Sequence, residues 1–175
     1  MKRRLTFLMA VLLVFSHSPL GAQSVPKAEV FAGFSAVHIN ADQGNFRITP
    51  VGWQTSIAGN INKTFGLVGD FGGVYKTFSG TKLISHHFLG GVQLNKRTEK
   101  ATVFAHAMWG GVNFRLDGSE TDFEMGYGGG IDVHATNRIA VRLIQFDWLP
   151  TRADSQWIKN VTRYGFGIVF KSRSE

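Results

Sequence analysis

The stretch RYGFGIVF, residues 163–170, decides the fold of this chain. Large apolar side chains occupy every second position, at Tyr164, Phe166, Ile168 and Phe170. Arg163, two glycines and a valine stand between them. A period of two sends alternate side chains to opposite faces of a β-strand. The stretch therefore predicts a strand with one large apolar face and one face of mostly small or polar residues, and the fold depends on how many other segments repeat this pattern.

Seven earlier segments of about ten residues repeat the same alternation, separated by clusters of Asn, Asp, Lys, Ser and Thr. The eight predicted strands are Glu29–Ile39, Val51–Ile61, Thr64–Tyr75, Leu83–Leu94, Thr102–Phe114, Phe123–His134, Ile139–Leu149 and Asn160–Phe170. After residue 22, no segment sustains an apolar repeat at helical spacing beyond about two turns. The chain is therefore predicted to be all-β, without a helical domain.

The connections between these strands alternate in length. Residues 62–63, 95–100 and 135–138 make short turns, whereas residues 40–50, 76–81, 115–122 and 150–159 make mostly longer loops. Short turns at one end and longer loops at the other describe an antiparallel up-and-down meander. Because the number of strands is even, the first and last strands can pair, and the meander is predicted to close into an eight-stranded barrel.

The N-terminal segment is predicted to be a cleaved signal peptide, residues 1–22, followed by the barrel domain, residues 23–175. Lys2, Arg3 and Arg4 precede the uncharged apolar run 5–15, which is too short to span a bilayer. An uncleaved anchor is the alternative. The chain has no cysteine, so an exported protein has neither a disulfide framework nor a cysteine for lipid attachment. No Lys/Arg run remains after residue 22 that would indicate nucleic-acid binding.

The composition of the two strand faces predicts which face meets lipid. A soluble lipocalin-like barrel, the alternative, would coat its exterior with Lys, Glu and Thr. Here the face opposite the aromatics consists of Gly, Ser, Ala, Gln and a few single charges, which suits a narrow lumen. The apolar face is therefore predicted to face the membrane, making this a transmembrane barrel. The residues available for interfacial aromatic girdles are Trp53, Tyr75, Trp109, Trp148 and Phe170.

Charges within the strands fall on the small-residue face and predict an ionic network that plugs the lumen. Its members are Asp70, Glu124, Asp132, Arg142 and Arg163. Lone charges are costly in a low-dielectric tube and paired ones are tolerable, so these residues should pair. If the turn is centred on Asn137, Asp132 stands across from Arg142. Asp147 lies on the other parity of its strand, which a bulge or nearness to the loop end would explain.

Two stretches, GLVGDFGGVY (residues 66–75) and GYGGGIDVHATNRIAVRLIQFDWLPTR (residues 126–152), carry a family resemblance. With these the chain resembles the OmpA-like family of small eight-stranded outer-membrane barrels, over nearly all of its length after residue 22. The resemblance implies an integral protein of the bacterial outer membrane, usually without enzymatic activity. Arg163, Gly165, Ile168 and Phe170 also resemble the final-strand signal that barrel-assembly machinery reads, which implies that machinery as a partner during biogenesis.

The sequence predicts no catalytic residue, metal site or cofactor. Some barrels of this size modify lipid A, which requires a serine and histidine oriented by a carboxylate. Ser85 and His86 are sequence neighbours and point to opposite faces of a strand, which argues against such a pair. The histidines are instead expected to make hydrogen bonds at the rim or in the lumen. No HExxH motif, paired-histidine pattern or acidic calcium loop is present.

Three functions remain open at this stage. The leading hypothesis is a structural, envelope-stabilising barrel with surface loops for adhesion or partner contact. The alternatives are a lipid A-modifying enzyme and a small solute pore. Outer-membrane lipids are the expected partners, and the chain is expected to be a monomer. Cations near the loop end suit lipopolysaccharide phosphates or solvated loops equally: Arg47, Lys76, Lys82, Arg115, Arg152 and Lys159.

Overall fold

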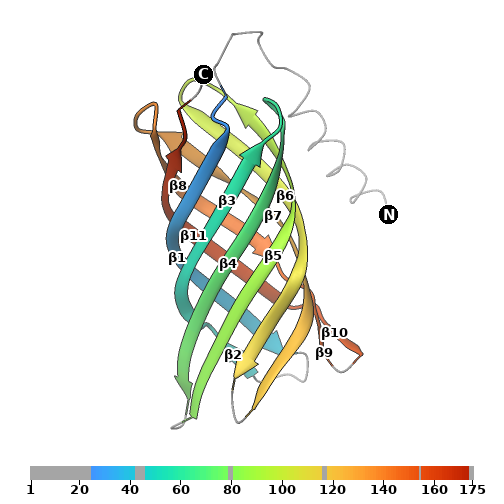
Figure 1. The fold of residues 1–175 in the computed structure, drawn as a ribbon. Coiled ribbons are helices and arrows are strands. Elements are labelled where there is room, and N and C mark those ends of the chain that lie inside the picture. The colour runs from blue at the N-terminus through green and yellow to red at the C-terminus, as the bar shows by residue number, and fades with distance from the viewer. Residues whose placement is uncertain (1–24, 42–45, 79–80, 116–117, 154, 174–175) are drawn as a thin grey trace, which may run out of the picture.

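A computed structural model describes residues 25–41, 46–78, 81–115, 118–153 and 155–173, and the predicted signal peptide lies outside them. Figure 1 shows one tilted barrel. Its wall consists of β1 (Ala28–Ala41), β3 (Val51–Asn60), β4 (Phe65–Phe78), β5 (Thr81–Arg97), β6 (Ala101–Arg115), β7 (Ser119–His134), β8 (Ile139–Trp148) and β11 (Val161–Lys171). Each of these strands pairs antiparallel with the next along the chain. The predicted eight-stranded meander is confirmed.

The barrel closes between its first and last strands, as predicted. β1 and β11 are antiparallel neighbours from Glu29 opposite Lys171 to Ile39 opposite Val161. Beyond the last pair, the Ser172 backbone N–H donates to the Ala28 carbonyl oxygen, 2.8 Å away. The closed ladder gives the backbone groups of both edge strands partners, which a bilayer interior requires because it offers no water.

The loop end differs from the prediction in its detail. The predicted loop 150–159 contains a hairpin, β9 (Thr151–Ala153) and β10 (Gln156–Ile158), and the loop 40–50 contains β2 (Phe46–Ile48). β4 and β5 also run past the predicted ends at Tyr75 and Leu83, and at the opposite, short-turn end β5 continues to Arg97. These extensions are rich in polar residues. Beyond the apolar layer, the strands stay paired but no longer alternate between apolar and polar residues. Their sequences therefore do not indicate where they end.

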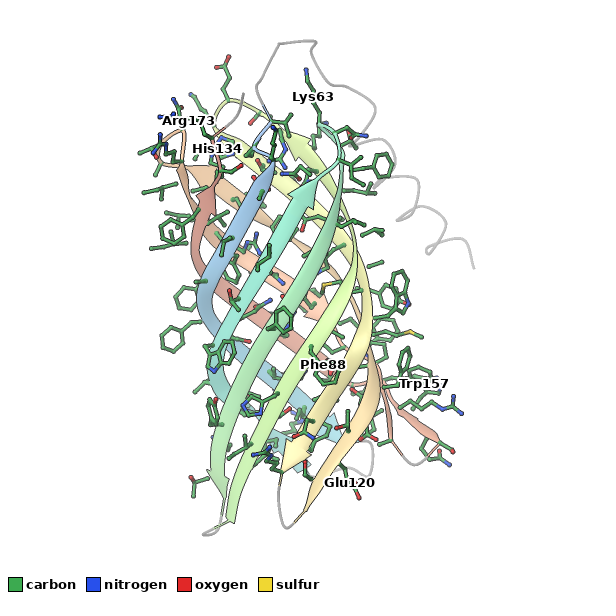
Figure 2. All side chains as sticks on the ribbon, viewed as in Figure 1. Lys63, Phe88, Glu120, His134, Trp157 and Arg173 are labelled. Atoms are coloured by element: carbon green, nitrogen blue, oxygen red, sulfur yellow. The ribbon has the colours of Figure 1, made fainter. Side chains whose placement is uncertain are left out.

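The barrel is inside out compared with a soluble protein, as the face composition predicted. Among the described residues, thirty large apolar side chains are exposed, whereas eighteen polar or charged ones are buried. Figure 2 shows side chains pointing away from the barrel all around its wall. All five predicted girdle residues are among the exposed ones, from Tyr75 at 38% to Phe170 at 51%. No helix within the described residues is long and apolar enough to cross a membrane.

A one-residue bulge in β8 explains the parity of its second half. Ile131 pairs with Ile144 and Asp132 with Arg142, which leaves Leu143 as the extra residue. Leu143 and Ile144 are both exposed, at 59% and 49%. Every residue beyond the bulge consequently changes face. Of the two explanations for Asp147, the bulge is the one that the structure shows.

Candidate functional site in the barrel lumen

Arg163 lies at the centre of the lumen between two fully buried carboxylates, those of Asp70 and Asp147. Its Nη1 donates to Asp70 Oδ1 at 2.7 Å, and its Nε and Nη2 donate to Asp147 Oδ2 at 2.9 and 2.7 Å. Gln54 Nε2 donates to the remaining oxygen of Asp70 at 2.6 Å, and His106 Nε2 lies 2.7 Å from Asp147 Oδ1. One guanidinium thus bridges two carboxylates from opposite walls of the barrel.

Arg142 forms the second centre, toward the short turns. Its Nε and Nη2 donate to the two oxygens of Asp132 at 2.7 and 3.0 Å, in the bidentate geometry that strengthens such pairs. The guanidinium carbon lies 4.2 Å from the ring centroids of both Phe31 and Phe104, and is held between the two rings. This accounts for Phe31, which faces inward although it is large and apolar.

The two arginine centres belong to one hydrogen-bonded ladder. Arg142 Nη1 donates to Gln145 Oε1 at 2.6 Å, and Gln145 Nε2 donates to Asp147 Oδ2 at 2.8 Å. We call this set the central ladder: Gln54, Asp70, His106, Asp132, Arg142, Gln145, Asp147 and Arg163. It fits because glycine faces it from the wall. A Cβ at Gly165 would come within 2.7 Å of Gln54 Oε1, and one at Gly128 would overlap the Asp147 carboxylate.

Glu124 does not join the central ladder. Its two carboxylate oxygens lie 2.8 and 2.9 Å from His87 Nδ1, whereas the ion pairs of Arg142 and Arg163 go to aspartates. The register explains this, because Glu124 stands opposite Gly110 of β6, while His87 stands opposite Val112 of the same strand. Both side chains are buried on the lumen face, and they meet across β6. The predicted five-residue network is therefore divided between two clusters.

Ser85, His87 and Glu124 form a contact series of serine, histidine and glutamate, since Ser85 Oγ lies 3.4 Å from His87 Nε2. This order matches a nucleophile, a base and an orienting carboxylate. However, the Ser85 side chain is buried with only 2% exposed, and the Oγ–Nε2 distance is at the long limit of a hydrogen bond. A nucleophile must be reached by its substrate, so burial favours a structural cluster. As predicted, Ser85 and His86 occupy adjacent positions whose side chains alternate between the two faces.

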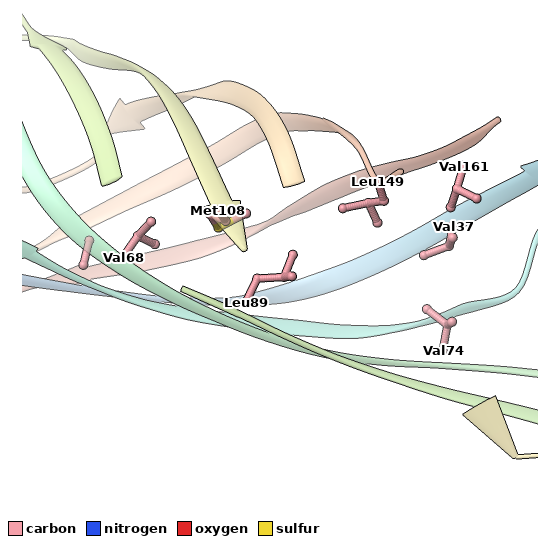
Figure 3. Close-up of a cluster of buried hydrophobic side chains, with 8 residues drawn as sticks. Val37, Val68, Val74, Leu89, Met108, Leu149 and Val161 are labelled. Atoms are coloured by element: carbon pink, nitrogen blue, oxygen red, sulfur yellow. The ribbon is translucent and has the colours of Figure 1, made fainter. Parts of the chain in front are cut away.

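Apolar side chains close the lumen at the loop end. Figure 3 shows Val37, Val74, Leu149 and Val161 together, and we call these four residues the apolar cap. Leu149 is completely buried, and its backbone N–H donates to the Val161 carbonyl oxygen at 2.9 Å. Toward the middle of the barrel, Leu89 and Met108 continue the same apolar cluster. The cap therefore separates the central ladder from the loop end.

A third polar cluster fills the lumen at the short-turn end. Arg97 Nη1 and Nη2 donate to the two oxygens of Glu29 at 2.8 and 3.1 Å, and Nη2 also donates to Asn60 Oδ1 at 2.9 Å. Asn95 Nδ2 donates to Asn60 Oδ1 at 3.3 Å, and Gln93 Nε2 donates to Asn95 Oδ1 at 2.8 Å. Side chains thus occupy the lumen at both ends and in its middle. Among the described residues, no group of three or more His, Cys, Asp or Glu could hold a metal ion.

Sequence reasoning missed several residues of these clusters. The unbroken parity of β8 would place Asp147 on the apolar face, and only the bulge at Leu143 turns it and Gln145 inward. Alternation along β6 does not reveal that His106 contacts Asp147 of β8. Residues two apart share a strand face, so His87 and not its neighbour His86 lies on the face of Ser85. That spacing was visible in the sequence.

The residues of the predicted assembly signal divide between the two faces of β11. Arg163 and Gly165 are buried, whereas Ile168 and Phe170 are exposed at 45% and 51%. Phe170 stands opposite Val30 of β1, at the short-turn end of the closing seam. The girdle residues also make local contacts, since Trp53 Nε1 donates to the Tyr75 hydroxyl at 3.1 Å and the Tyr127 and Trp148 rings lie 6.0 Å apart.

Known proteins match this chain through their structures. No protein-family model and no curated protein matches its sequence. The fold is similar to that of Neisserial surface protein A, with a TM-score of 0.68 and 14% identity over 83% of this chain and 97% of that one. It is also similar to the outer membrane protein OprG of Pseudomonas aeruginosa, with a TM-score of 0.61 and 8% identity over 87% and 98% of the two chains. Its similarity to Ail, the attachment invasion locus protein of Yersinia pestis, has a TM-score of 0.59 and 14% identity over 83% of this chain and 98% of that one.

These identities are low, so the likeness shows the fold alone. That fold is the small eight-stranded barrel, and membership of the OmpA-like family in particular stays a prediction.

Proposed function

We propose that this chain is an integral protein of the bacterial outer membrane, with a structural, envelope-stabilising role and surface loops available for partner contact. The observation that carries the proposal is the inverted distribution of side chains, with large apolar groups outside and charged groups inside. Exposing so much apolar surface to water would be costly, whereas lipid solvates it. The fold shared with outer-membrane proteins such as OprG supports the same location.

The filled lumen favours a structural role over a solute pore. The ion pairs of Arg163, Arg142 and Arg97 link opposite or neighbouring walls, and the apolar cap lies between the ladder and the loop end. A continuous water path would have to separate several of these buried pairs, each of which is costly to break. We therefore expect single-channel recordings in planar bilayers to show conductance near zero. A large, steady pore in the unmodified protein would contradict this role.

Location and folding can be tested in one experiment. The protein should fractionate with outer membranes, and its unboiled form should migrate differently from its boiled form on a denaturing gel, because a closed barrel resists detergent. A soluble protein without a heat-dependent shift would overturn the proposal. Lipid A mass spectra should be identical with and without the protein, and a protein-dependent change would favour the enzymatic alternative.

The assembly signal in β11 is the part of the proposal that concerns biogenesis. Deleting residues 164–170 should abolish membrane insertion, because it removes both the seam with β1 and Phe170 of the proposed signal. The matched control removes residues 171–175 and leaves the signal intact, so it should still insert. Equal insertion of both variants would contradict recognition by assembly machinery.

A further inference from the structure

The short-turn end of the barrel carries a ring of positive charge. Its members are Lys27, Lys63, Lys96, Lys100, Arg138, Lys171 and Arg173, and we call these seven residues the short-turn ring. Arg97 of the same end lies in the lumen and pairs with Glu29. The other described acidic residue of these turns and strand ends is Glu99, which leaves an excess of six positive charges. Asp132 lies further inside and is paired with Arg142. The four loop-end segments instead contain five basic and five acidic residues, a net charge of zero.

Backbone hydrogen bonds hold the ring residues at one level around the barrel. The carbonyl oxygens of Lys27, Lys100 and Arg138 accept hydrogen bonds from the backbone N–H groups of Asn60, His134 and Lys171, respectively. Each of these donors lies at the end of a neighbouring strand. The same circle is completed by Thr64 with Asn95 and by Ala28 with Ser172. Every short turn and both terminal strand ends therefore contribute a cation. Figure 2 shows Lys63 and Arg173 at this end, opposite Glu120.

The ring borders the lipid-facing surface directly. Lys63 lies between Ile61 and Phe65, which are 70% and 52% exposed, and Arg138 precedes Ile139, which is 38% exposed. Lys96 is on the same strand parity as the outward-facing Val92. Cations just beyond an apolar belt can lay their aliphatic stems along it and present their charges at headgroup depth. The arrangement is a belt around the wall, not one cleft.

The local electrostatics agree with an excess of positive charge. His134 ends β7 at this rim, beyond the apolar belt. Burial lowers the pKa of its imidazole, and the charges of Lys171 and Arg97 lower it further, against opposing effects of the Glu99 backbone and Glu29. The lowering contributions of Lys171 and Arg97 show that cations from two neighbouring strand ends act at this rim.

We propose that the short-turn ring binds the headgroups of anionic phospholipids in the periplasmic leaflet. This inference rests on the proposed function, because it requires the barrel to span the outer membrane with its short turns in the periplasm. Basic residues beside an anionic leaflet are attracted to it over about one Debye length, roughly 8 Å at physiological salt. The ring would fix the depth of the barrel and gather phosphatidylglycerol-type lipids around it.

The test measures which lipids stay with the barrel. The protein is refolded into nanodiscs of equimolar phosphatidylglycerol and phosphatidylcholine, and the retained lipids are identified by native mass spectrometry. We expect phosphatidylglycerol to be preferred by roughly threefold to fivefold. The ring variant combines Lys63→Gln, Lys100→Gln, Arg138→Gln and Arg173→Gln, all at exposed side chains, and its preference should fall close to one. Raising the salt to about 1 M should have the same effect on the unmodified protein.

The matched control neutralises four exposed cations at the loop end. It combines Lys76→Gln, Arg115→Gln, Arg152→Gln and Lys159→Gln, and should keep the preference. Because both nanodisc leaflets have the same composition, the two variants identify the end that selects the lipid. An unchanged preference in the ring variant, or a loss only in the loop-end control, would overturn the inference.

Two further readouts separate this inference from its alternatives. The heat-dependent gel shift is measured for every variant in purely zwitterionic vesicles. If no variant shifts, the proposed function itself fails, whereas shifted barrels without a lipid preference refute only the ring. Co-sedimentation with purified peptidoglycan sacculi covers the other acidic partner of this compartment. Ring-dependent binding to sacculi without a phosphatidylglycerol preference would overturn the lipid assignment.

Discussion

Two layers of the lumen are equally buried but have opposite chemistry. The central ladder holds Arg163 between two carboxylates, while the apolar cap beside it packs Leu149 against three valines. A truncated cap residue loses its own contacts and leaves a cavity. A truncated ladder residue leaves its former partners as buried charges without a counter-ion, which lowers the free energy of unfolding by more than the lost contact does. Burial alone therefore does not predict how much stability a substitution in this lumen costs. The chemistry of the groups that are left without a partner does.

The largest effect is expected for Arg163→Met. The substitution keeps an apolar side chain of considerable length but leaves Asp70 and Asp147 without their shared cation. Removing one partner from a buried ion pair typically costs about 3–5 kcal/mol in the free energy of unfolding. We expect a loss of that size, measured by denaturant titration of the refolded barrel.

A triple variant tests the reason for this loss. Adding Asp70→Asn and Asp147→Asn to Arg163→Met removes the stranded charges and should restore a large part of the stability, because an uncharged set needs no counter-ion. If the triple variant were as unstable as the single one, packing of the arginine and not charge would explain the difference between ladder and cap.

Arg142→Ala should follow, at about 3 kcal/mol. It leaves Asp132 unpaired and removes the group between the rings of Phe31 and Phe104. Conductance should nevertheless stay near zero, because the rest of the ladder, the cap and the Glu29–Arg97 pair still fill the lumen. Arg142→Lys is the control. It keeps the charge but not the planar fork, so it should lose less stability than alanine does. A steady current through Arg142→Ala would show that this residue alone plugs the barrel.

The outer layer of this structure was predictable from the sequence, and the ladder only in part. Inward and outward positions differ by one residue along a strand, so alternation alone gave the strands, the closure and the inward face of Asp70 and Arg163. The same dependence on single steps explains the failure at Asp147, because one bulged residue reverses every face beyond it. A bulge leaves no periodic signal of its own.

Partner choice was the second limit of the sequence. Asp132 and Arg142 flank one short turn, so counting residues paired them. Phe31 faces inward because a guanidinium from β8 lies against its ring, and β8 is distant in sequence. Charge alone predicts that Glu124 joins the arginines, whereas the strand register brings it to His87. Contacts across a barrel depend on shear and register, and a single sequence does not reveal these for distant strands.

In the apolar cap, Leu149→Ala should cost about 2–3 kcal/mol. Leu149 is fully buried, so the change leaves a cavity among Val37, Val74 and Val161 without exposing a charge. Denaturant titration should show a smaller loss than for Arg163→Met. Leu149→Met, which roughly conserves volume, should cost less than about 1.5 kcal/mol. A loss for Leu149→Ala above that of Arg163→Met would reverse the ranking of the two layers.

Ser85→Ala is expected to have the smallest effect, below about 1 kcal/mol, because its contact with His87 is long and the His87–Glu124 pair remains intact. The variant also separates two interpretations of this cluster. If the serine is structural, lipid A spectra from cells with the unmodified protein, with Ser85→Ala and without the protein should be identical. A nucleophile would instead give a lipid A change that disappears in Ser85→Ala at unchanged barrel content. Glu124→Gln provides the matched comparison, since it keeps the shape of the side chain but removes the charge facing His87. In a structural cluster it should destabilise the barrel more than Ser85→Ala does, because the His87–Glu124 contact is short and buried whereas the serine contact is long.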